Sequence, residues 1–169
     1  MRIYLIGFMG SGKTTLGRRL AKYANLQFID MDDFIEERYC KTVPQIFAEE
    51  GEGEFRDKER KALEELAQFT DIVIATGGGA PCFFDNIDLM NNTGKTVYLD
   101  IPPETLSTRL MQSKTERPLI KGKSQKELVN FINHTLSKRN TFYKKAKYHI
   151  TDPDTEPHEI IKIISEQSN

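Results

Sequence analysis

The chain has 169 residues, a formal net charge of -1, and 38% hydrophobic and 29% charged residues. This length suits one domain with a single core, and a pI near 6.3 argues against the basic surface that a nucleic-acid or membrane-surface partner requires. No apolar run is long enough to span a bilayer. We therefore expect a cytoplasmic monomer without a signal peptide, with two free cysteines and no zinc site.

The strongest motif lies near the N-terminus, where residues 7–14 read G-F-M-G-S-G-K-T. An apolar run precedes it and a helical pattern over residues 15–21 follows, which is the context of a phosphate-binding loop. Its glycines let backbone N–H groups turn around an anion, and the helix adds the positive end of its dipole. Lys13 can reach the β- and γ-phosphates, and the Thr14 hydroxyl can bind Mg²⁺. The motif predicts that these residues bind a nucleoside triphosphate: Gly10, Ser11, Gly12, Lys13, Thr14 and Thr15.

Further along the chain, short apolar runs alternate with segments of helical periodicity. Strands are expected at residues 2–6, 26–30, 72–76, 96–100 and 148–151. Helices are expected at residues 34–39, 42–48, 53–69, 85–92, 104–111, 124–144 and 156–166. Because the strands are apolar throughout, they indicate a parallel sheet covered on both faces. The predicted fold is a single α/β domain over residues 1–169, a three-layer α/β/α arrangement of P-loop kinase type with a five-stranded parallel sheet.

A phosphate-binding loop alone leaves GTPases, ATPase motors and small-molecule kinases open. The sequence has no N-K-x-D motif to bind guanine, and no D-x-x-G motif follows an apolar strand. A motor usually needs a larger domain or partner subunits. A compact kinase remains, with a lid and an acceptor pocket formed by its own chain.

Five motifs together make the chain resemble the shikimate kinase family over nearly its whole length. They are Asp30-Met31-Asp32, Phe55-Arg56, Gly77-Gly78-Gly79-Ala80, Arg117-Pro118-Leu119, and Lys138-Arg139 followed by Tyr143. The resemblance implies transfer of the γ-phosphoryl group of ATP to the 3-hydroxyl of shikimate, with Mg²⁺. It also implies a lid at residues 112–123 and a substrate-binding helical region at residues 31–60. Two alternatives stay open: a gluconate or nucleoside-monophosphate kinase on the same scaffold, and a nucleotide-binding module without catalysis.

The acceptor implied by this resemblance carries a carboxylate and three hydroxyls, so its site needs both cations and hydrogen-bond acceptors. Arg56 and Arg139 are the candidates for a guanidinium clamp, because the planar fork matches a carboxylate. Glu59 lies three residues from Arg56 and could orient it. Phe47 and Phe55 are expected to wall the pocket, although core packing is an equal alternative for Phe47.

The remaining roles follow the strand ends, where ligands of such sheets bind. Asp32 is the candidate to bind the acceptor hydroxyls and take the proton of the attacking one, and a helix cap is its structural alternative, which Asp33 could also provide. Asp30 is expected to hold Mg²⁺ through water beside Thr14. The turn at residues 77–79 would bring backbone N–H groups against a substrate hydroxyl.

Two arginines complete the predicted nucleotide site. The family assigns Arg117 to the lid, where it can neutralise charge on the transferred phosphoryl group, as Lys13 does from the loop. The family often has an arginine near the adenine after the last strand, but residues 151–157 of this chain contain no basic residue. A backbone contact from this segment to the adenine stays open, and Arg109, in the helix before the lid, is the second-best candidate, to stack on the base.

Overall fold

The core of the protein is one sheet of five parallel strands in the order β2-β3-β1-β4-β5. It is seen in a computed structural model that describes residues 1–113 and 120–166. The strands are β1 (Arg2–Ile6), β2 (Gln27–Asp30), β3 (Ile72–Ala75), β4 (Lys95–Leu99) and β5 (Tyr148–Ile150). Each lies within one residue of its expected bounds, and the predicted fold class is confirmed.

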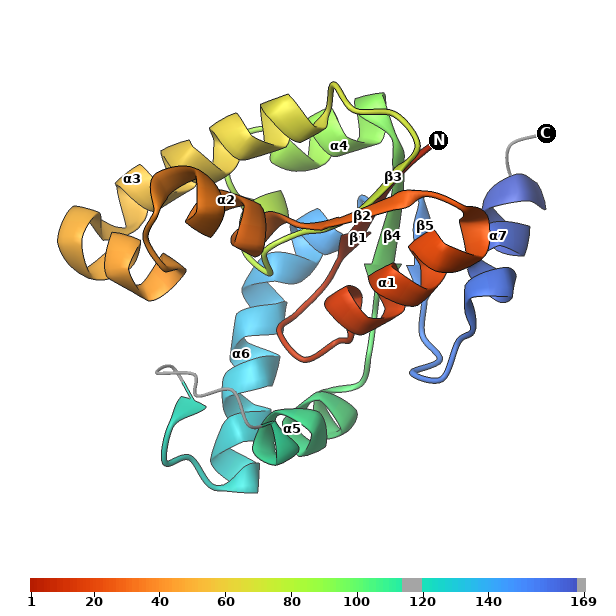
Figure 1. The fold of residues 1–169 in the computed structure, drawn as a ribbon. Coiled ribbons are helices and arrows are strands. Elements are labelled where there is room, and N and C mark those ends of the chain that lie inside the picture. The colour runs from red at the N-terminus through yellow and green to blue at the C-terminus, as the bar shows by residue number, and fades with distance from the viewer. Residues whose placement is uncertain (114–119, 167–169) are drawn as a thin grey trace.

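Helices cover both faces of this sheet, so the three central strands are buried almost throughout. The helices are α1 (Lys13–Ala24), α2 (Met31–Tyr39), α3 (Val43–Leu66), α4 (Asn86–Thr93), α5 (Pro103–Gln112), α6 (Gln125–Tyr143) and α7 (Pro157–Glu166), with a short 3₁₀ helix η1 (Ala80–Cys82). Figure 1 shows α1 and α7 on one side of the sheet and α4 and α6 on the other. This two-sided cover explains why the strands have apolar sequences rather than alternating ones.

Helix α3 contains a kink at the point where the sequence predicts a break between two helices. Thr42 and Gln45 form a capping box at its start, and the helix continues to Leu66. Gly51 has φ 86° and ψ 172°, which is not helical, so α3 consists of two helical segments that meet at this residue. The expected pair of helices is therefore present, joined by one glycine instead of a loop.

Helix α2 begins three residues earlier than the hydrophobic pattern indicates. Its N-cap is Asp30, whose Oδ1 accepts a hydrogen bond from the backbone N–H of Asp32 at 3.1 Å. Neither Asp32 nor Asp33 is the cap, so the structural alternative for Asp32 is wrong. All three acids suit a helix start, and only the backbone geometry distinguishes them.

The chain leaves β1 and β3 in opposite directions, which places a ligand site between the ends of these two strands. The chain continues from β1 into α1 on one face, and from β3 through η1 into α4 on the other (Figure 1). Such a switch point is where open α/β sheets bind ligands. Among the described residues, no helix has both the length and the apolar character needed to cross a membrane.

Candidate functional site

The phosphate-binding loop connects β1 to α1 in a conformation that requires glycine. Gly10 and Gly12 have φ of 79° and 97°, the left-handed region that residues with a Cβ rarely adopt. Gly12 directly precedes α1, so the positive end of the helix dipole faces the loop. The Nζ of Lys13 donates to the carbonyls of Gly7 and Phe8 at 2.8 and 2.9 Å, which holds its charge inside the loop.

Thr14 and Asp30 meet beside this loop. The Oγ1 of Thr14 donates to Oδ2 of Asp30 at 2.7 Å, while Oδ1 of Asp30 caps α2. Two neutral or anionic oxygens at this spot fit Mg²⁺, which usually takes one or two protein ligands together with substrate phosphates. No group of three or more His, Cys, Asp or Glu side chains that could hold a metal by themselves occurs in the described part of the chain.

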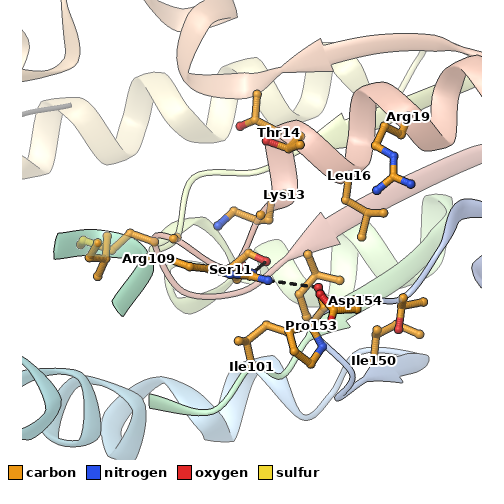
Figure 2. A pocket seen from close by; sticks show the side chains of 18 of the residues that line it. Ser11, Lys13, Thr14, Leu16, Arg19, Ile101, Arg109, Ile150, Pro153 and Asp154 are labelled. Carbon is orange, nitrogen blue, oxygen red and sulfur yellow. Dashed lines mark hydrogen bonds between the residues drawn. The ribbon is translucent and has the colours of Figure 1, made fainter. Parts of the chain in front are cut away.

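A cavity of about 630 Å³ runs along the loop and is large enough for a nucleotide. Its lining includes residues 152–156, after β5, as well as Asp32 and Gly78. Figure 2 shows Arg109 between the loop and the segment after β5. Its guanidinium donates to the carbonyls of Ser11 at 3.2 Å and Pro153 at 3.1 Å, so the predicted base-stacking residue does line the nucleotide cavity.

Three consecutive glycines after β3 face three of the predicted acceptor-binding groups. A Cβ on Gly77 would lie 3.0 Å from Oδ1 of Asp32 and 2.9 Å from Oε1 of Glu59. On Gly78 it would lie 3.4 Å from a guanidinium nitrogen of Arg139, and on Gly79 it would lie 2.7 Å from one of Arg56. The sequence-predicted carboxylate and both predicted arginines therefore converge on one short turn from three different helices.

Arg56 is held by carboxylates and aromatic rings. Its guanidinium donates to Glu59 at 2.8 Å and to Glu52 at 3.1 Å, and its side chain is 11% exposed. The rings of Phe55 and Phe47 lie 5.1 and 6.0 Å from its Cζ. Phe47 is 37% exposed and is therefore not a core residue, whereas Phe55 is 3% exposed and packs in the core.

Glu59 and Asp32 are carboxyl groups with unusual acidity. Burial raises the pKa of Glu59 to about 7, although its ion pair with Arg56 opposes the shift. Burial also raises the pKa of Asp32 to about 6, and the neighbouring charge of Asp30 adds to this effect while Lys13 opposes it. Oε1 of Glu59 is buried and has no hydrogen-bond partner among the residues that the structure describes. A carboxyl group with a pKa near neutrality suits proton transfer and marks a candidate functional site.

Arg139 is positioned from α6. It donates to the hydroxyl of Tyr143 at 3.4 Å, and its Cζ lies 5.8 Å from the ring centroid of Phe8. The Tyr143 hydroxyl in turn donates to the carbonyl of Gly78. This chain of contacts ties α6 to the glycine turn and to the phosphate-binding loop.

Not every predicted residue can be placed. Arg117 and half of the predicted lid, residues 114–119 of 112–123, lie outside the described residues. Conversely, no sequence pattern indicates Phe83, whose ring centroid lies 4.0 Å from Cζ of Arg56, closer than either predicted aromatic residue. It stands in Cys82-Phe83-Phe84, a stretch without helical or strand periodicity.

A phosphate-binding loop at the switch point of a five-stranded parallel sheet, beside a glycine turn that two arginines and a carboxyl group face, is typical of a P-loop kinase that acts on a small molecule. A sequence model of the family "Shikimate kinase" matches residues 9–168. The chain is 56% identical over 147 residues to shikimate kinase of Phocaeicola vulgatus, covering 87% of this chain and 84% of that one.

Solved structures agree with this match. The crystal structure of shikimate kinase from Bacteroides thetaiotaomicron has a TM-score of 0.91 and 46% identity, covering 99% of this chain and 97% of that one. A shikimate kinase from Acinetobacter baumannii, solved in complex with shikimate, has a TM-score of 0.83 and 35% identity, covering 98% and 91% of the two chains. The chain belongs to the shikimate kinase family and is an enzyme of the transferase class.

Proposed function

We propose that this protein transfers the γ-phosphoryl group of ATP to the 3-hydroxyl of shikimate, giving shikimate 3-phosphate and ADP. The observation that carries the proposal is the convergence of Asp32, Arg56 and Arg139 on the glycine turn at residues 77–79, next to the phosphate-binding loop. Two cations that can bind a carboxylate lie there beside a carboxylate that can accept hydrogen bonds from hydroxyl groups. An acid with several hydroxyls is the acceptor that this set fits.

In this proposal Arg56 and Arg139 bind the carboxylate of shikimate, because two guanidinium groups neutralise the anion and offer it paired N–H donors. Asp32 binds the hydroxyls and takes the proton of the attacking one. Its raised pKa brings its proton affinity closer to what a general base needs near neutral pH. Because phosphoryl transfer has a loose transition state, the main work of Asp32 is to orient the hydroxyl.

Residues 10–15 hold the triphosphate, and Lys13 neutralises charge that develops on the β- and γ-phosphates. Thr14 and Asp30 would hold Mg²⁺, which supplies charge neutralisation at the phosphates. Arg109 lines the nucleotide cavity near the base, and Arg117 acts from the lid. We further propose that the enzyme is a cytoplasmic monomer whose ligands are small molecules, without nucleic-acid or membrane partners.

The two alternatives have less support. A nucleoside-monophosphate acceptor carries a phosphate that calls for further cations in the pocket, while the glycine turn is faced by two carboxylates and two arginines. A module without catalysis does not need a lysine, a threonine and two acids arranged around a phosphate-binding loop. Family membership favours the shikimate reaction over both.

The assignment is tested by incubating the purified protein with MgATP and one acceptor at a time: shikimate, gluconate or AMP. ADP should form with shikimate and stay at background level with the other two and with no acceptor. A lack of shikimate-dependent ADP would refute the assignment, and turnover with gluconate or AMP would favour the corresponding kinase.

The clamp is tested by Arg56→Ala. We expect KM for shikimate to rise roughly 100-fold, because one partner of a buried charge-assisted interaction is lost. KM for ATP should stay near its normal value. Arg38→Ala is the matched control, since Arg38 makes an exposed ion pair with Glu65 on the surface. Equal loss of both affinities in the Arg56 variant would contradict the clamp.

A further inference from the structure

The segment that follows the glycine turn places an aromatic ring on Arg56. Gly79 and Phe83 flank the single turn of η1, and both contact the same guanidinium group. Cζ of Arg56 lies 3.0 Å from the position that a Cβ on Gly79 would occupy and 4.0 Å from the centroid of the Phe83 ring. Phe83 is thus the closest of the three rings around this cation.

Phe83 is fixed in place by the residues that come directly after it. Asp85 and Asn86 accept hydrogen bonds from one guanidinium nitrogen of Arg60 at 2.5 and 2.8 Å, and Asn86 also donates to the carbonyl of Ala80 at 2.8 Å. Arg60 lies one helical turn beyond Arg56 on α3. The same helix therefore carries the cation and anchors the segment that holds the ring.

The ring acts on Arg56 in a different way from its carboxylate neighbours. Glu52 and Glu59 each engage an N–H group of the guanidinium, and every such bond uses a donor that a ligand could otherwise take. An aromatic face attracts the cation through its quadrupole and takes none of the five N–H donors. The attraction is stronger where water is excluded, and the Arg56 side chain is mostly buried.

We propose that Phe83 is a positioning residue of this enzyme: its ring fixes the plane of the Arg56 guanidinium so that the N–H edge meets the carboxylate of the acceptor. The inference rests on the proposed function, in which Arg56 binds that carboxylate. It adds a residue from the segment after η1 to the determinants of acceptor affinity. Phe83 itself need not touch the acceptor.

The test compares three variants. Phe83→Leu keeps an apolar side chain but removes the aromatic face, so KM for shikimate should rise about five- to tenfold, which lies between the values for an exposed and for a desolvated cation–π contact. The values of kcat and of KM for ATP should not change, and Phe83→Tyr should restore KM for shikimate. Phe84→Leu is the matched control, because this neighbouring ring is 58% exposed.

A second acceptor separates positioning of Arg56 from general damage to the pocket. With the shikimate analogue whose carboxylate is replaced by a hydroxymethyl group, at concentrations high enough to give measurable turnover, Phe83→Leu should change KM less than twofold. An equal rise in KM for both acceptors, no rise for shikimate, or no rescue by tyrosine would overturn the inference while leaving the function intact. If the parent enzyme shows no shikimate-dependent turnover, the function and the inference fall together.

Discussion

The phosphate-binding loop and the acceptor pocket both contain glycines, and the two sets serve different physical needs. In the loop, Gly10 and Gly12 adopt φ of 79° and 97°. A Cβ on Gly12 would have only a nitrogen of Arg109 within 4 Å, at 3.6 Å, whereas a Cβ on Gly10 would lie 3.0 Å from the side chain of Leu110. In the pocket, Gly79 has an ordinary φ of -88°, but a Cβ there would lie 2.7 Å from Arg56. Gly12 is needed for the backbone shape of the loop, Gly79 is needed for space in the pocket, and Gly10 is needed for both.

The phosphate-binding loop and the acceptor pocket also differ in how many segments of the chain form them. The loop is a continuous stretch whose conformation depends on its own residues. The pocket is assembled from the ends of β2 and β3 and from the helices α3 and α6, so its shape depends on contacts between distant segments. A change in the loop should affect the nucleotide, and a change in the pocket should affect the acceptor.

The largest expected effect comes from Lys13→Met. We expect kcat to fall at least about 10²–10³-fold, because a positive charge directed at the phosphates is lost. KM for shikimate should change much less than kcat, since the hydrogen bonds of Lys13 go to the carbonyls of Gly7 and Phe8 and its charge reaches the acceptor side only by lowering the pKa of Asp32. Steady-state kinetics on this variant and on Lys22→Met, which alters an exposed lysine of the same helix, check the result. A parallel loss of shikimate affinity would show that the two halves are not separable.

Gly79→Ala and Gly12→Ala test the two uses of glycine directly. The added methyl group at residue 79 must displace the Arg56 guanidinium, so we expect KM for shikimate to rise roughly tenfold or more while KM for ATP stays constant. At residue 12 the methyl group has space but the backbone is strained, so KM for ATP should rise instead. Kinetics with each substrate varied in turn measure both values. The same pattern in both variants would break the distinction.

Glu59→Gln tests the electrostatics of the acceptor pocket through stability. The pKa of Glu59 is raised from an ordinary 4.5 to about 7, so the folded state binds this proton more tightly than the unfolded state. The resulting stabilisation is complete below pH 4.5 and is lost as the pH rises through about 7. The glutamine variant lacks this titration. Its stability relative to the parent should therefore increase across that window, by at most about 3 kcal/mol.

Urea unfolding at a series of pH values gives this difference in the free energy of unfolding. Glu64→Gln is the control, because Glu64 lies on the same helix with a side chain that is 54% exposed. A difference between parent and Glu59→Gln that stays constant from pH 4 to pH 8 would contradict the raised pKa.

The smallest expected effect is a gain in stability at Gly53. This residue lies in the helical part of α3, and nothing would contact an added Cβ within 4 Å. Gly53→Ala should therefore raise the free energy of unfolding by about 0.5–1 kcal/mol without changing either KM. Gly51→Ala should lower it, because Gly51 has φ 86° at the kink. Thermal or urea unfolding of the pair distinguishes a glycine that the fold requires from one that it does not.

Those parts of the protein that depend on short stretches of sequence could be predicted. The apolar strands, the loop at residues 7–14 and the break near Gly51 each carry their signal locally, and all are present in the structure. The residue that caps α2 could not be predicted from the sequence. Asp30, Asp32 and Asp33 all suit a helix start and differ only in backbone geometry.

The acceptor pocket could be predicted only with the help of the family resemblance. Nothing in the local sequence distinguishes Arg56 or Arg139 from other arginines on helix surfaces. Their shared position at the glycine turn arises from the packing of α3 and α6. Phe83 had neither a periodic signal nor a family motif, because its role depends on the path of the chain after η1. The roles of these side chains in binding and catalysis stay predictions until the variants are measured.

The glycine turn also limits how the pocket can evolve. Every substitution of Gly77 or Gly79 adds at least a methyl group at a point 3.0 Å or less from a carboxylate or guanidinium atom. A mutation that narrows the pocket from this side therefore also displaces Asp32, Glu59 or Arg56. Drug resistance often arises by adding bulk next to an inhibitor. An inhibitor that packs against Gly77 and Gly79 would contact a surface that cannot be reshaped without moving the side chains that we propose bind the acceptor.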